Sequence, residues 1–173
     1  HLEDGAAFSD LIGKTLVRNA KNFIILAADP GEGVEEKIGY ASADIMLYAQ
    51  ELGLNTWWVG ASFNKEAVKK ESPDHTVYGV ISVGYGDNQG VPHQSKDDFE
   101  VCSYEGEAPQ WFKDGVEYAL MAPTAFNRQL FYIKGKGNTV TIEYKAGEFQ
   151  GIDTGLVKYH FEAAAGKENF EWA

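Results

Sequence analysis

Residues 122 to 129 read Ala-Pro-Thr-Ala-Phe-Asn-Arg-Gln, and they join a helical pattern to a strand pattern. The run from Trp111 to Met121 has apolar residues at helical spacing, and Pro123 denies such a helix its next backbone donor. Amide and hydroxyl side chains in the segment add to the unpaired backbone groups of a helix end. The segment therefore predicts either an ordinary capped helix end or a corner that can hold a flat, polar ring.

Apolar patterns predict the elements that come before this corner. Residues 34 to 52 follow helical spacing with apolar positions on more than one side, and Gly53 is a natural end for that helix. We expect this helix to be central, mostly buried and near a dimer interface. The other elements predicted here are a helix over 7–17, a strand over 22–28, a β-prone segment over 54–60, a helix over 64–70 capped by Asn64 or Ser62, and a strand over 76–85.

The segment after the corner predicts a hairpin and a final helix. Strands over 129–134 and 139–145 are joined through the turn residues 135–138. Asp153 is expected to cap a helix over 154–165 that ends at Gly166. Helices and strands mix without regular alternation, which predicts an α+β fold with a mostly antiparallel sheet flanked by helices.

Composition limits the class of protein. The chain has 173 residues, of which 44% are hydrophobic, so we expect a single ordered domain over 1–173. The formal net charge of −11 makes nucleic acid an unfavourable partner. No run approaches the ~20 apolar residues of a membrane span, so we expect no membrane partner and a cytoplasmic location. Cys102 and the four histidines show no metal-ligand spacing, and no serine has the context of a nucleophile.

Four other segments accompany residues 122–129 in a fixed order. They are Ala-Gln-Glu-Leu-Gly-Leu-Asn-Thr-Trp-Trp-Val-Gly at 49–60, Val-Gly-Tyr-Gly at 83–86, Gln-Gly-Val-Pro-His-Gln-Ser-Lys at 89–96, and Ile-Asp-Thr-Gly-Leu-Val-Lys-Tyr-His-Phe at 152–161. Together they make the chain resemble the nitroreductase family of flavin mononucleotide (FMN) enzymes. The resemblance is to a branch with the Ala-Pro-Thr/Ser-Ala-x-Asn-x-Gln segment late in the chain, and it covers most of residues 20–173.

This resemblance implies an intertwined homodimer with FMN bound between the subunits. It implies that Lys96 contacts the FMN phosphate. Gly60 has no Cβ, which suits a close approach of backbone to a ring. The positions that the resemblance assigns to cofactor binding are Trp58, Val59, Gly60, Lys96, Pro123, Thr124, Ala125, Asn127 and Gln129.

The resemblance also implies a reaction, in which FMN receives electrons from NAD(P)H and passes them to a nitroaromatic, a quinone or a similar small aromatic acceptor. The flavin carries this chemistry, so no catalytic side chain is expected. Family members usually open with an Arg-rich phosphate-binding motif, which is absent before His1, and we expect the chain to lack that N-terminal segment. Two alternatives follow: a binding or structural protein of the same fold with weak or lost flavin binding, and a flavin-consuming or dehalogenating relative.

Overall fold

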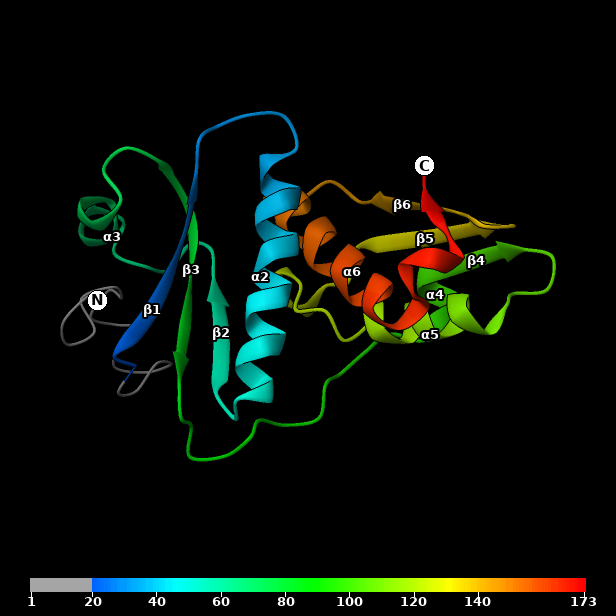
Figure 1. Ribbon diagram of the computed structural model, residues 1–173, viewed down its shortest axis with the longest axis horizontal. Helices are drawn as coiled ribbons and strands as arrows, with labels where there is room; N and C mark the ends of the chain where they lie inside the picture. Colours follow the sequence, from blue (N-terminus) through cyan, green and yellow to red (C-terminus); the bar gives the residue numbers. More distant parts are fainter. Residues whose placement is uncertain (1–19) are drawn as a thin grey trace.

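The computed structural model describes residues 20 to 173, and one long helix stands at its centre. Figure 1 shows α2 (Val34–Glu51) between a three-stranded sheet on one side and a helix-covered second sheet on the other. This arrangement confirms the predicted α+β fold and the central place of the helix. The helix predicted over residues 7–17 lies outside the described residues.

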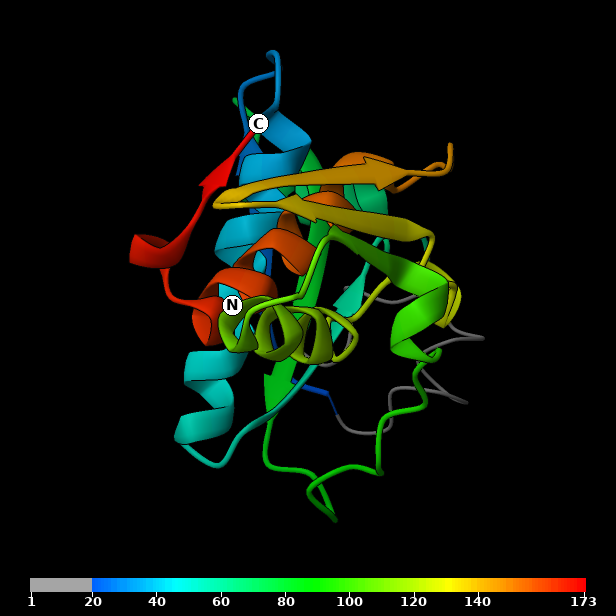
Figure 2. The same ribbon diagram turned by 90° about the vertical axis from the view of Figure 1, so that its right-hand side faces the viewer.

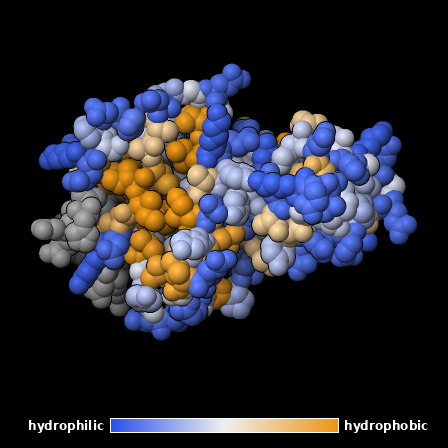
Figure 3. Space-filling view, viewed as in Figure 1, coloured by the Kyte–Doolittle hydropathy of each residue, from blue (hydrophilic) through white to orange (hydrophobic). Residues whose placement is uncertain are grey.

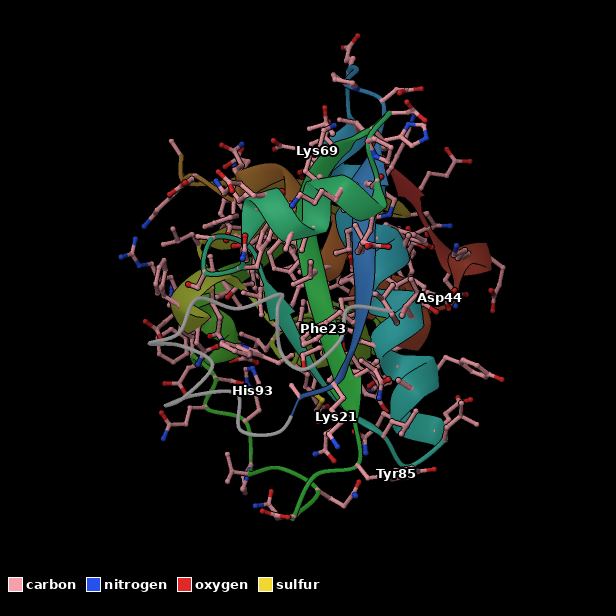
Figure 4. All side chains as sticks on the ribbon, turned by 90° about the vertical axis from the view of Figure 1, so that its left-hand side faces the viewer. Lys21, Phe23, Asp44, Lys69, Tyr85 and His93 are labelled. Atoms are coloured by element: carbon pink, nitrogen blue, oxygen red, sulfur yellow. The ribbon has the colours of Figure 1, made fainter. Side chains whose placement is uncertain are left out.

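Sheet one is wholly antiparallel and has the order β1-β3-β2. Its strands are β1 (Asn22–Ala28), β2 (Asn55–Val59) and β3 (Thr76–Gly84), close to the predicted ranges. At the middle of the sheet, Ile81 lies opposite both Ile24 and Trp58. Helix α3 (Lys65–Glu71) lies over this sheet in Figure 4, and the Asn64 side chain caps it by accepting the Ala67 N–H at 3.1 Å.

Sheet two has the order β4-β5-β6-β7 and combines both kinds of pairing. β5 (Phe131–Lys136) and β6 (Thr139–Tyr144) form the predicted antiparallel hairpin. β4 (Cys102–Glu105) pairs in parallel with β5, and β7 (Glu171–Trp172) pairs in parallel with β6. Neither β4 nor β7 was predicted. Helices α5 (Gln110–Ala119) and α6 (Gln150–Ala165) pack together beside this sheet, as Figure 2 shows. Phe112, Ile133 and Phe161 lie in the core between them. The short elements α4 (Asp98–Val101), η2 (Ala125–Asn127) and η3 (Lys167–Asn169) complete the described chain.

The two sheets are held together where α2 crosses α6. A Cβ on Gly39 of α2 would lie 2.0 Å from the backbone oxygen of Ile152, and a Cβ on Gly155 of α6 would lie 2.0 Å from the backbone oxygen of Glu36. These distances leave no room for any side chain, so the two helix backbones are in direct contact. The crossing therefore fixes the position of sheet one relative to α6.

Two sequence-based expectations about helix ends are wrong. Asp153 does not cap the last helix, because α6 already begins at Gln150 and Asp153 lies inside its first turns. Pro123 does not end α5, which stops at Ala119 with Leu120 as its C-cap. The Asp153 carboxylate instead accepts the Ala125 N–H, a contact between distant segments that local sequence signals do not report.

Gly53 ends α2 as predicted, with a left-handed φ of 75°. The residues of α2 that are buried within the chain are Gly39, Ser42, Ala43 and Ala49, while Tyr48 and Leu52 stay exposed. The helix is therefore central as predicted, but it is not mostly buried, because one side of it faces outward. Across residues 20–173, no helix is both long and apolar enough to span a membrane.

We predict that Gly155→Ala destabilises the protein although alanine is the better helix former. The added methyl group has to displace the α2 backbone, and such overpacking costs about 1–3 kcal/mol or more, against a gain of about 1 kcal/mol in helix propensity. The measurement is the free energy of unfolding in urea. Gly31→Ala is the control, because a Cβ there meets nothing within 4 Å. A Gly155→Ala protein as stable as the wild type would contradict the crossing described above.

Candidate functional site

Two segments that are distant in the sequence meet around one cavity of about 370 Å³. One is the end of β2 and the turn after it, residues 56–62, and the other is residues 123–126 between α5 and β5. Met46 of α2, Phe149, and Asp153 and Leu156 of α6 close the remaining sides. From here on, residues 123–127 are called the corner. The cavity therefore lies where sheet one, α2, α6 and the corner come together.

Six of the nine residues assigned to cofactor binding line this cavity. They are Trp58, Val59, Gly60, Pro123, Thr124 and Ala125. Lys96, Asn127 and Gln129 do not line it. The structure thus brings both halves of the predicted ring site together, and their part in cofactor binding stays a prediction.

The wall formed by β2 is anchored in the core. Trp58 is half-buried, and its indole N–H donates to the Ser42 hydroxyl of α2 at 3.2 Å. A Cβ on Gly60 would lie 2.5 Å from the Phe149 ring and 2.6 Å from the Trp58 ring. The missing side chain of Gly60 therefore makes room for these two rings, which is a different reason for glycine from the close ligand approach expected from the sequence.

Sheet one ends at β2, which gives this wall a further property. Among the described strands only β3 pairs with β2, so β2 is an edge strand of sheet one. Residues 56 to 59 of this edge strand line the cavity. The backbone of an edge strand therefore forms part of the cavity wall.

The opposite wall has an unusual backbone. Phe126, Asn127 and Gln129 have φ values of 55°, 52° and 48°, in the left-handed region that side chains other than glycine rarely adopt. Such a conformation costs free energy and persists only where surrounding contacts impose it. Backbone strain of this kind is concentrated at functional sites, although it does not by itself identify one.

Gln129 supplies many of the contacts that impose this backbone. Gln129 is 2% exposed, and its side-chain amide donates to the carbonyl oxygens of Gln94 and Leu120, each at 3.3 Å. The backbone N–H of Gln129 donates to the Thr124 hydroxyl at 3.1 Å. Asn127 also donates to the Gln94 carbonyl, at 2.8 Å. The amide side chains of Gln129 and Asn127 therefore both bond to the Gln94 carbonyl and help to hold the corner in place.

Lys96 lies on the same side as Gln129. Its backbone N–H donates to the Gln129 side-chain oxygen, and its ammonium donates to the Gln129 carbonyl, both at 2.8 Å. Lys96 and Gln129 line a second cavity of about 440 Å³ that also includes Lys145. One of the three donors of the Lys96 ammonium is thus used, and Gln129 connects it to Thr124 in the wall of the first cavity.

Among the described residues that line the first cavity, Asp153 is the only one with an acidic or basic side chain. It is 4% exposed, and both carboxylate oxygens accept the Ala125 N–H, at 3.1 and 3.0 Å. Oδ2 also accepts the Tyr144 hydroxyl of β6. Burial raises the pKa of Asp153 above its usual range, while the bonds from Tyr144 and Ala125 act in the opposite direction.

Sequence reasoning assigned no site role to Met46, Phe126, Phe149 or Asp153. Phe126 lies at the exposed side of the cavity, with 81% of its surface accessible and the Arg128 guanidinium 5.1 Å from its ring centre. The Ile-Asp-Thr-Gly run at 152–155 was a signal that could have identified Asp153, since an acidic residue in an otherwise apolar and small-residue helix face calls for a partner. No local pattern marks Met46 or Phe149.

Comparison with known proteins identifies the family and the fold. A family model described as "Putative TM nitroreductase" matches residues 2–165. The chain is also similar to the crystal structure of a putative nitroreductase from Thermotoga maritima, with a TM-score of 0.67 and 20% sequence identity. The match covers 89% of this chain and 64% of that one, and at this identity it shows a shared fold. No curated protein matches the chain. Because the family model matches most of its length, the chain belongs to the putative TM nitroreductase family.

Proposed function

We propose that the chain is an FMN-dependent oxidoreductase whose flavin ring lies in the cavity between residues 58–60 and the corner. The observation that carries this proposal is the meeting of these two segments around one cavity. FMN, when bound, supplies the transfer of electrons from NAD(P)H to a small aromatic acceptor such as a nitroaromatic or a quinone. The membership of the family supports this activity.

The cavity suits a flat heteroaromatic group. Its volume of about 370 Å³ is within the range of small-ligand pockets, roughly 300–1,000 Å³. Trp57, Phe126 and Phe149 supply aromatic surface, and the backbone of β2 forms one wall of the cavity. These residues would orient the ring and exclude water from its inner face. The exposed side at Phe126 would admit NAD(P)H and the acceptor in turn.

The phosphate of FMN needs a cation, and none of the described residues that line the ring cavity is basic. Lys96 is our proposed contact, because two of its three ammonium donors stay available and Gln129 connects it to the cavity wall. A ring site without this contact would bind riboflavin and FMN equally. A chain that binds neither would instead fit the alternative of a binding or structural protein on the same fold.

We also propose a homodimer, because apolar side chains are exposed at the C-terminal end of α2. Leu47, Tyr48 and Leu52 are 38%, 62% and 54% exposed near the end of this helix. Figure 3 shows apolar side chains gathered over the face of the molecule that contains β1, β3 and α2. Exposed apolar areas of this kind mark interaction surfaces.

The ring site is tested by filling the cavity. We expect wild-type protein to quench FMN fluorescence, and Met46→Trp to weaken this binding by at least about tenfold, because the larger ring occupies the space of the ligand. Met121→Trp is the matched control, since Met121 is 46% exposed and does not line the cavity. Equal affinity of the wild type and Met46→Trp would place the flavin elsewhere.

The phosphate contact is tested with two ligands. Lys96→Met is expected to reduce FMN affinity by roughly tenfold, the effect of losing one charge-assisted contact, while riboflavin affinity changes little. Lys145→Met is the control, because Lys145 lines the same second cavity and is exposed. Isothermal titration calorimetry of each variant with FMN and with riboflavin gives the ratio of the two affinities. A parallel loss for FMN and riboflavin would mean that Lys96 only supports the corner.

The dimer is tested at the end of α2. Leu52→Glu places a charge among the exposed apolar side chains at the end of α2 and is expected to shift the protein to monomers at micromolar concentration. Light scattering after size exclusion measures the molar mass. Glu117→Gln, on the exposed side of α5, is the control. A wild-type protein that is already monomeric would refute this part of the proposal.

A further inference from the structure

The carboxylate of Asp153 connects three separate parts of the fold. It is carried by α6, it accepts the Ala125 N–H of the corner with both oxygens, and it accepts the Tyr144 hydroxyl of β6. The side chain is 4% exposed and forms part of the cavity wall. Asp153 is therefore attached to the corner at the residue just before its left-handed segment.

Charged residues are also present on the segments that pack near Asp153. From α2, Glu36 pairs with Lys158 of α6 at 2.6 Å. From the corner side, the Arg128 guanidinium lies over the Phe126 ring, and Glu148 in the preceding loop is exposed. Among the described residues, no cation pairs with the Asp153 carboxylate, so its charge is supported by the Ala125 and Tyr144 bonds alone.

We propose that Asp153 is a positioning residue, whose ionised carboxylate holds the Ala125 N–H and thereby fixes the corner against the flavin ring. This inference rests on the proposed function. The bonds that an ionised carboxylate accepts are roughly twice as strong as those of a neutral acid. Protonation of Asp153 weakens its hydrogen bonds to the Ala125 N–H. The strained backbone at Phe126 and Asn127 then loses one of the contacts that hold it.

The sign of the pH dependence separates this role from a purely structural one. Because burial raises the pKa of Asp153, the folded protein binds this proton more readily than the unfolded chain. The stability contributed by this group therefore falls as pH rises from the usual carboxyl range through the raised pKa. Ring binding needs the ionised form, so it strengthens over the same interval. Stability and flavin affinity thus change in opposite directions.

Riboflavin is the suitable probe, because the phosphate of FMN itself titrates near pH 6. We expect wild-type affinity for riboflavin to rise on the order of tenfold as pH increases from the usual carboxyl range through the raised pKa of Asp153. Asp153→Asn should bind more weakly and show no such dependence, since an amide carries no charge and does not titrate. Tyr144→Phe should keep the dependence but move it to higher pH, because it removes one bond to the ionised form. Glu148→Gln, which is exposed, should behave as the wild type.

A measurement without flavin keeps this inference separate from the proposed function. In flavin-free protein, the NMR shift of the Ala125 amide proton should titrate with the Asp153 carboxyl, and it should not titrate in Asp153→Asn. An Ala125 shift that ignores pH, or a pH dependence of riboflavin affinity that survives in Asp153→Asn, would overturn the role of Asp153. A titrating Ala125 amide in a protein that binds neither riboflavin nor FMN would support the positioning contact and refute the flavin site.

Discussion

The close contact between the backbones of α2 and α6 is the constraint on which the cavity depends. Gly39 and Gly155 leave no atoms between the helices, so each backbone meets a carbonyl oxygen of the other. α2 lies along sheet one and α6 packs against α5, so this contact positions the end of β2 opposite the corner. Met46 of α2 and Asp153 of α6 then complete the same cavity. A wider helix crossing would separate its walls.

Within that frame, the two walls are built differently. The β2 wall is tied to the core through the Trp58 bond to Ser42 and the packing of Phe149 on Gly60. The corner is instead a strained loop, held by hydrogen bonds between Gln129 and Thr124 and between Asp153 and Ala125. A rigid wall and a braced loop together allow a flat ligand to be gripped while one side stays open at Phe126. The buried carboxylate costs stability, and natural proteins accept such costs mainly where function requires them.

Much of the secondary structure could be predicted from the sequence, because period and turn residues are local signals. The strand at 22–28, the helix beginning at 34 and the existence of the hairpin were confirmed, although its turn is Gly137-Asn138 and not the predicted 135–138. The parallel pairing of β4 with β5 and the split into two sheets were not foreseen, since both depend on contacts between distant segments. Asp153 was misread as a helix cap for the same reason: its partners, Ala125 and Tyr144, lie on other elements. The family resemblance located six residues of the cavity wall, whereas Met46 and Phe149 reach it only through the helix crossing.

The most direct test of this account is a crystal structure of the protein grown with FMN at saturating concentration. The account predicts electron density for the tricyclic ring between the backbone of residues 58–60 and the corner, with Asp153 still bonded to the Ala125 N–H. Ring density at any other place in the molecule, or a cavity in which Phe126 or Phe149 fills the space of the ring, would contradict it.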